Sequence, residues 1–104
     1  MICKTVKLNA EIDVRSDIKM TNLAKSIVHQ WNVDRWIPSE SEDPFNFREF
    51  VVWQCKILQN WKWLIATTRF DGYYFEVTFD GSRSAFYLDV YEKQENVEVI
   101  RDEN

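Results

Sequence analysis

Two Asp-Gly pairs constrain the fold of this sequence more than any other feature. They are Asp71-Gly72 and Asp80-Gly81, and they contain the only two glycines of the 104 residues. Both pairs lie beside runs of aromatic and β-branched residues. An Asp-Gly pair between such runs is typical of a β-hairpin, because a type I′ turn requires a positive φ at both central positions. The chain is therefore predicted to fold around consecutive antiparallel strands.

These pairs predict strands at Trp63–Phe70, Tyr73–Phe79 and Ala85–Glu92, with a further strand at Asn96–Ile100. Because side chains alternate across a strand, the strands present two faces. The apolar face comprises Tyr73, Phe75, Val77, Phe79, Phe86, Leu88 and Val90. The opposite face carries tyrosines and acids: Tyr74, Glu76, Thr78, Tyr87, Asp89 and Tyr91. The first face is predicted to be core, and the second to face outward.

The first third of the chain predicts a strand followed by a helix. From Thr5 to Val14, apolar and polar residues alternate strictly, as in a half-buried strand. Ser16 or Asp17 can cap a helix over residues 18–31. The apolar stripe predicted for this helix is Ile18, Leu23, Ala24, Ile27, Val28 and Trp31.

The middle of the chain allows two interpretations. Asn32–Asp43 has no consistent period and predicts an exposed loop. Asp43-Pro44 then has the form of a helix N-cap followed by proline in the first turn, which favours a second helix over residues 47–60. The rival interpretation is a strand, because apolar residues also alternate from Val51 to Ile57.

The predicted fold is a single α+β domain spanning residues 1–104. It has a strand, two helices and a three- to four-stranded antiparallel meander, with helices packed on one face. If residues 47–60 form a strand, the order becomes β-α-β4, as in cystatin-like folds, which is an analogy of pattern alone.

The charge balance is acidic. Seventeen Asp and Glu residues against thirteen Lys and Arg give a formal charge of −4. The acids gather in Ser39–Asp43 and in the tail after Glu92. This balance disfavours nucleic acid, whose phosphates require basic stripes, and favours a protein partner with a basic surface.

The sequence also predicts a soluble, cytoplasmic protein without a membrane partner. The N-terminus shows no signal peptide, and the uncharged stretches are far shorter than a membrane span. Cys3 and Cys55 lack metal-ligand spacing and are expected to be reduced thiols.

No combination of residues indicates catalysis, a metal site or a cofactor. His29 is the only histidine, and pairing it with Cys3 or Cys55 has no support in the sequence. Glu76 and Asp89 can face each other on adjacent strands among tyrosines, and paired carboxylates with an aromatic platform are found in glycosidases. Because like charges directly opposite repel, the register can instead stagger the two acids. An open sheet face offers no cleft to shift their pKa values, so we expect a protein without enzymatic activity.

Part of the C-terminal half is similar to known proteins. Asn60–Thr68, Asp71–Phe79 and Tyr87–Tyr91 resemble small uncharacterised proteins of phages and prophages of Gram-positive bacteria. This resemblance implies an intracellular accessory protein of a phage or mobile element, located in the bacterial host cytoplasm and binding a host protein. It implies no catalytic residues.

We therefore expect a small acidic protein-binding module that inhibits a host or defence protein. Tyrosine gives large contact area at low entropic cost, and aromatic residues are enriched at binding hot spots. The expected partner-binding residues are Tyr74, Glu76, Tyr87, Asp89, Tyr91, Trp36, Glu40, Glu42 and Asp43. The alternatives are a single-stranded nucleic-acid binder that stacks bases on aromatic residues, and a self-assembling structural protein that dimerises through the edge at Asn96–Ile100.

Overall fold

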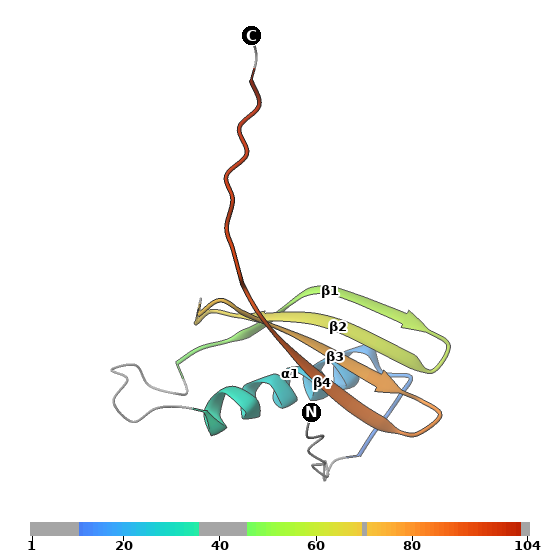
Figure 1. Ribbon diagram of the computed structural model, residues 1–104. Coiled ribbons are helices and arrows are strands. Elements are labelled where there is room, and N and C mark those ends of the chain that lie inside the picture. Colours follow the sequence, from blue (N-terminus) through green and yellow to red (C-terminus); the bar gives the residue numbers. More distant parts are fainter. Residues whose placement is uncertain (1–10, 36–45, 70, 103–104) are drawn as a thin grey trace.

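One helix packs against a four-stranded antiparallel sheet in the computed structural model, which describes residues 11–35, 46–69 and 71–102 (Figure 1). The elements follow in the order α1 (Asp17–Asp34), β1 (Glu49–Ile57), β2 (Asn60–Thr67), β3 (Tyr73–Asp80) and β4 (Ala85–Glu92). The strands lie in the sheet in their chain order, each antiparallel to the next. The fold is α+β, as predicted.

Helix α1 confirms the prediction over residues 18–31 and extends it by one turn. The Ser16 side chain caps the N-terminus by accepting a hydrogen bond from the backbone N–H of Lys19. The fully buried side chains of α1 are Met20, Ala24, Val28 and Asn32, spaced four residues apart. The predicted stripe was partly wrong, because it omitted Met20 and included Ile18, which is 74% exposed.

The predicted second helix is wrong. Residues Glu49–Ile57 form β1, so the strand interpretation of this segment is the correct one. The segment pairs antiparallel with β2, from Glu49 opposite Thr67 to Ile57 opposite Asn60. Pairing with β2 provides hydrogen-bond partners for the backbone N–H and C=O groups of this segment, and its β-branched and aromatic residues suit a strand. These two effects outweigh the helix start that Asp43-Pro44 indicates.

Two further predicted strands do not appear among the described residues. Of Thr5–Val14, residues 5–10 lie outside the described residues, and residues 11–14 form no strand. Asn96–Ile100 is described but belongs to no ladder, and the chain after β4 extends away from the sheet (Figure 1). Alternation alone does not make a strand, because a strand requires a hydrogen-bonded neighbour. Within the predicted loop Asn32–Asp43, Asn32–Asp34 belong to α1, and residues 36–43 are outside the described residues.

Both Asp-Gly pairs lie in hairpin connections, but neither forms a type I′ turn. Gly72 has a φ of 85°, whereas Asp71 has no positive φ. In the β3–β4 connection the residue with positive φ is Ser84, at 51°. Asp80 turns the chain there by accepting hydrogen bonds from both the N–H and the hydroxyl of Ser82. The hairpins were predicted correctly and their turn type was not.

The core lies between α1 and one face of the sheet. It joins the buried helix residues Met20, Ala24 and Val28 to the buried sheet residues Trp61, Trp63, Ile65, Phe75, Val77 and Phe79. Trp61 and Trp63 stack with their ring centroids 5.5 Å apart. Their indole N–H groups donate to the Val14 carbonyl and to the Thr21 hydroxyl, respectively. Of the predicted core residues, Val90 is 36% exposed, at the outer edge of the sheet.

Candidate binding surface

The face of the sheet opposite α1 is the candidate site, and we call it the open face. Its members follow from strand alternation and from the register, since residues opposite one another share a face. From β1 and β2 they are Phe50, Val52, Trp53, Cys55, Lys62, Leu64 and Ala66. From β3 and β4 they are Tyr74, Glu76, Thr78, Tyr87, Asp89 and Tyr91. Figure 1 shows α1 on the other side of the sheet.

The β3–β4 part of this face, which we call the tyrosine/acid half, brings together five of the predicted site residues. They are Tyr74, Glu76, Tyr87, Asp89 and Tyr91. Tyr74 lies directly opposite Tyr91, and Glu76 directly opposite Asp89. The three tyrosines are 42–51% exposed. Of the two registers that the sequence allows, facing or staggered, the structure has Glu76 and Asp89 facing each other.

Two basic side chains modify the charge of this half. The Lys62 ammonium lies 3.2 Å from a carboxylate oxygen of Glu76. This contact offsets the repulsion expected between acids on directly opposed residues. The Arg83 guanidinium donates to the Tyr87 hydroxyl at 3.5 Å, and this hydrogen bond raises the pKa of Arg83 above its ordinary value. Asp89 remains the exposed acid of the pair.

The β1–β2 part of the open face, which we call the apolar half, was missed by sequence reasoning. Phe50, Val52 and Trp53 are 43%, 52% and 50% exposed. A β-bulge places both Val52 and Trp53 opposite Leu64, so two consecutive apolar residues occupy the space of one. The signal that could have revealed this surface is the alternation from Val51 to Ile57, on which the strand interpretation rests.

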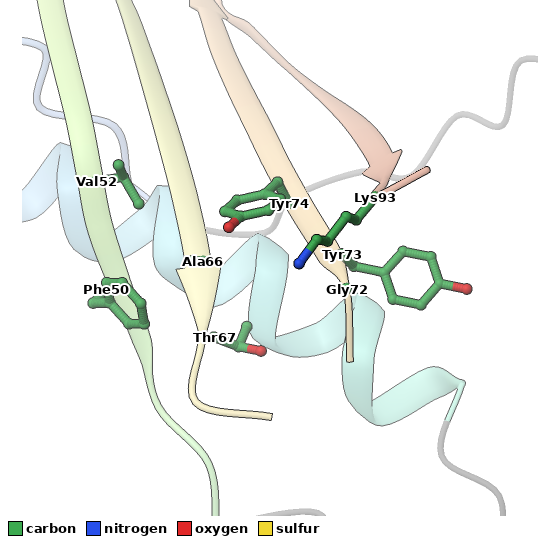
Figure 2. Close-up of a pocket in the computed structure, with 8 residues that line it drawn as sticks. All are labelled: Phe50, Val52, Ala66, Thr67, Gly72, Tyr73, Tyr74 and Lys93. Carbon is green, nitrogen blue, oxygen red and sulfur yellow. The ribbon is translucent and has the colours of Figure 1, made fainter. Parts of the chain in front are cut away.

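A shallow pocket of about 330 Å³ crosses the end of the open face (Figure 2). Its lining comes from all four strands and their ends: Phe50, Val52, Ala66, Thr67, Gly72, Tyr73, Tyr74 and Lys93. The side chains of Tyr74 and Lys93 extend toward β2, with Phe50 and Val52 on β1 beyond it (Figure 2). Lys93 is the one charged residue of this lining.

The remaining predicted site residues are Trp36, Glu40, Glu42 and Asp43, and all four lie outside the described residues.

The sole histidine lies on the other side of the sheet. His29 Nδ1 is 2.5 Å from a carboxylate oxygen of Glu49, and its ring stacks on Phe47 with centroids 4.8 Å apart. These contacts join α1 to the start of β1. Cys55 pairs with Lys62 on the open face, so the sheet separates it from His29. Among residues 11–35, 46–69 and 71–102, no group of three or more His, Cys, Asp or Glu side chains is placed to hold a metal ion.

Comparison with known proteins gives a family without an assigned function. Neither the curated proteins nor the solved structures contain a match. Within the described part of the chain, no helix combines the length and the apolar character that crossing a membrane requires. The model of one family matches residues 21–101, which include α1 and all four strands. The chain therefore belongs to the family of unknown function DUF6275.

Proposed function

We propose that this protein is a small, non-enzymatic binding module whose tyrosine/acid half contacts a protein partner with a basic surface. One observation carries the proposal: α1 covers only one face of the sheet, and three tyrosines with two acids project from the other. A half-exposed tyrosine offers an apolar ring together with a polar hydroxyl, which is the chemistry enriched at protein interfaces.

The charge of this region supports a basic partner. Residues 71–102 contain eight acidic and three basic side chains, a net charge of −5. Residues 46–69 contain four basic side chains and one acid, a net charge of +3. The acidity is thus concentrated in β3, β4 and the tail, where complementary charge accelerates association with a basic protein.

The biological role that we propose follows from the resemblance to phage and prophage proteins in Asn60–Thr68, Asp71–Phe79 and Tyr87–Tyr91. In this proposal the protein is an accessory protein of a phage or mobile element, acting in the host cytoplasm. It binds a host or defence protein and inhibits it by occupying a basic surface. The acidic segment with Trp36, Glu40, Glu42 and Asp43 extends the contact.

Binding of single-stranded nucleic acid is the second candidate. Exposed tyrosines on a sheet can stack bases, and Lys62, Arg83 and Lys93 lie on or beside the same face. The net charge of −5 over residues 71–102 opposes phosphate binding, so we place this function second.

The test is affinity capture from a Gram-positive bacterial lysate with three immobilised forms of the full chain. They are the wild type, the double charge reversal Glu76→Lys/Asp89→Lys and the matched control Glu11→Lys/Asp34→Lys. Glu11 precedes α1 and Asp34 is its last residue, and both are exposed acids outside the open face. We expect a stoichiometric protein partner with the wild type and the control, and at least a tenfold loss of it with the double reversal.

Two results would contradict the proposal. The first is a partner retained by the double reversal at wild-type level, and the second is the absence of any stoichiometric partner. A labelled single-stranded oligonucleotide separates the second candidate: a nucleic-acid binder shifts it with steep salt dependence, whereas an acidic protein-binding module does not.

A further inference from the structure

The chain after β4 carries exposed apolar residues in an extended segment. Residues 93–102 leave the sheet at the end of β4 and point away from it (Figure 1). Val97, Val99 and Ile100 are 65%, 87% and 77% exposed. Valine and isoleucine are typical strand residues, and their exposure in water is unfavourable by comparison with a packed position. This segment therefore has the composition of a strand without a sheet.

The outer edge of β1 offers the complementary feature. β1 is an edge strand, paired with β2 on one side only in the described sheet. The bulge at Val52 leaves a regular stretch from Trp53 to Ile57. An open edge of this kind is a template for a strand from another chain, and the bulge restricts pairing to the five residues beyond it.

The two stretches match in pattern in an antiparallel register of four residues. Val97–Ile100 would lie opposite Gln54–Ile57, which places Val97 opposite Ile57, Glu98 opposite Lys56 and Val99 opposite Cys55. On β1, Trp53 and Ile57 are exposed on the open face, whereas Lys56 lies on the α1 face with its ammonium 5.4 Å from the Trp61 ring centroid. In the tail, Val97 and Val99 alternate with Glu98. Pairing the stretches with the valines on the open face places Glu98 on the same face as Lys56.

Charge and geometry favour a second molecule as the source of the segment. Residues 94–100 carry Glu95 and Glu98 and no basic residue, while residues 46–69 have a net charge of +3. Within one chain, β4 and β1 are the two opposite edges of the sheet, and the segment points away from both (Figure 1). A second copy presents its β1 edge without requiring the tail to cross the sheet.

We propose that Val97–Ile100 of each of two copies adds as an antiparallel strand to the Gln54–Ile57 edge of the other. The valines extend the apolar half of the open face in the partner, and Glu98 pairs with Lys56. The tyrosine/acid half stays free, so this self-association is independent of the proposed binding function.

The first experiment measures the mass of the full chain by sedimentation equilibrium over a concentration series. The forms compared are the wild type, Val97→Asp/Val99→Asp and the matched control Gln94→Asp/Asn96→Asp. The control adds the same charge without altering the apolar face of the segment. We expect a wild-type dimer of twice the 12.5 kDa chain mass. The valine variant should raise the dimer Kd at least tenfold, and the control less than about threefold.

The variants also separate loss of pairing from loss of folding. None of the substituted positions belongs to the core, so all forms should share one thermal unfolding midpoint when measured well below the dimer Kd. A wild type that stays monomeric at about 500 μM, or a valine variant that dimerises like the wild type, would overturn the proposal.

A charge exchange and a disulfide trap test the position of the segment. Glu98→Lys should weaken the dimer, and adding Lys56→Glu should restore it to within about threefold of the wild-type Kd. In a Cys3→Ser background, Val99→Cys should oxidise to a disulfide-linked dimer through Cys55, and the further change Cys55→Ser should abolish that product. A dimer that persists without Cys55, or a disulfide formed within one chain, would overturn the proposed pairing.

Discussion

The two faces of the sheet are built from alternate residues of the same strands, yet they differ in almost every physical property. On the face toward α1, Trp63, Phe75 and Val77 are fully buried. On the open face, the adjacent Tyr74 is 45% exposed, and Glu76 pairs with Lys62 at the surface. The difference arises from coverage, because α1 contributes Met20, Ala24 and Val28 to one face only.

Burial concentrates stability in the face toward α1, whereas the recognition that we propose uses the open face. Removing a buried side chain loses its transfer free energy and leaves a cavity, whereas a half-exposed side chain loses little. Substitutions on the open face cost little stability, so the residues of this face can be selected for binding to a partner.

The largest effect is expected for Trp63→Ala on the covered face. Trp63 is fully buried, stacks on Trp61 and donates its indole N–H to the Thr21 hydroxyl at 3.2 Å. Truncation should destabilise the protein by about 3–5 kcal/mol, measured by urea denaturation. Trp63→Phe is the matched control and should cost less, because it keeps most of the apolar volume. A loss below about 1 kcal/mol for Trp63→Ala would show that the covered face is not the source of stability.

The second largest loss of stability is expected at the β3–β4 turn, which sets the register of β4 and therefore which of its residues face α1. A Cβ added at Gly81 would lie 2.5 Å from the Gln59 carbonyl oxygen, a backbone atom of the β1–β2 turn. Gly81→Ala should therefore force the two turns apart and cost about 1–3 kcal/mol in urea denaturation.

Gly72→Ala is the comparison for that prediction. A Cβ at Gly72 meets only the Lys93 Cβ, at 3.7 Å, but the φ of 85° is unfavourable for alanine. Its cost should be about 1 kcal/mol, from backbone strain alone. Equal losses at both glycines would mean that contact with Gln59 does not constrain the β3–β4 turn.

On the open face, Tyr74→Ser should change the free energy of unfolding by less than about 1 kcal/mol. Tyr74 contributes no buried core contact, although it lines the pocket beside Phe50 and Lys93. The same change should weaken capture of the partner, because it removes one of the three exposed aromatic rings of the tyrosine/acid half. If Tyr74→Ser destabilised the protein as much as Trp63→Ala does, the two faces would contribute equally to stability, contrary to this prediction.

The sequence predicts which residues lie on the covered face and which on the open face wherever the alternation within one strand is enough to assign them. The predicted bounds Ala85–Glu92 are those of β4, and alternation alone assigns to the tyrosine/acid half the same residues that the register places there. Strand residues alternate between the two faces. Once a turn fixes where a strand begins, each residue of that strand is assigned to one face.

The apolar half could not be predicted in the same way, because its first strand depends on a neighbour distant in the sequence. The segment Glu49–Ile57 is short, apolar and preceded by a proline, which suits a helix as well as a strand. Pairing with β2 makes this segment a strand instead of a helix. The bulge at Val52 and the β1 side of the pocket are consequences of that pairing. Asn96–Ile100 shows the converse: strand composition without a neighbour gives no strand.

The smallest predicted effect lies at the turn after β3 and depends on pH. The hydrogen bond from the Ser82 hydroxyl is the main cause that lowers the pKa of Asp80 below its ordinary value of 3.8. Because the folded protein holds the carboxylate form more strongly than the unfolded chain does, Asp80 stabilises the fold at pH values above 3.8. This contribution falls as the pH drops below that value and is lost once the pH passes the lowered pKa.

Asp80→Asn should therefore lower the urea midpoint slightly at pH 7, and the difference from the wild type should disappear in acid. Asn retains a carbonyl oxygen that accepts from Ser82, so the variant removes the charge and keeps the turn geometry. Ser82→Ala is the complementary change, because it removes the hydroxyl donor and should reproduce the same loss of pH dependence. A midpoint difference that stays constant from pH 7 into acid would assign the role of Asp80 to turn geometry instead of charge. The register that assigns β4 residues to the two faces would then depend on the geometry of this turn and not on the charge of the Asp80 carboxylate.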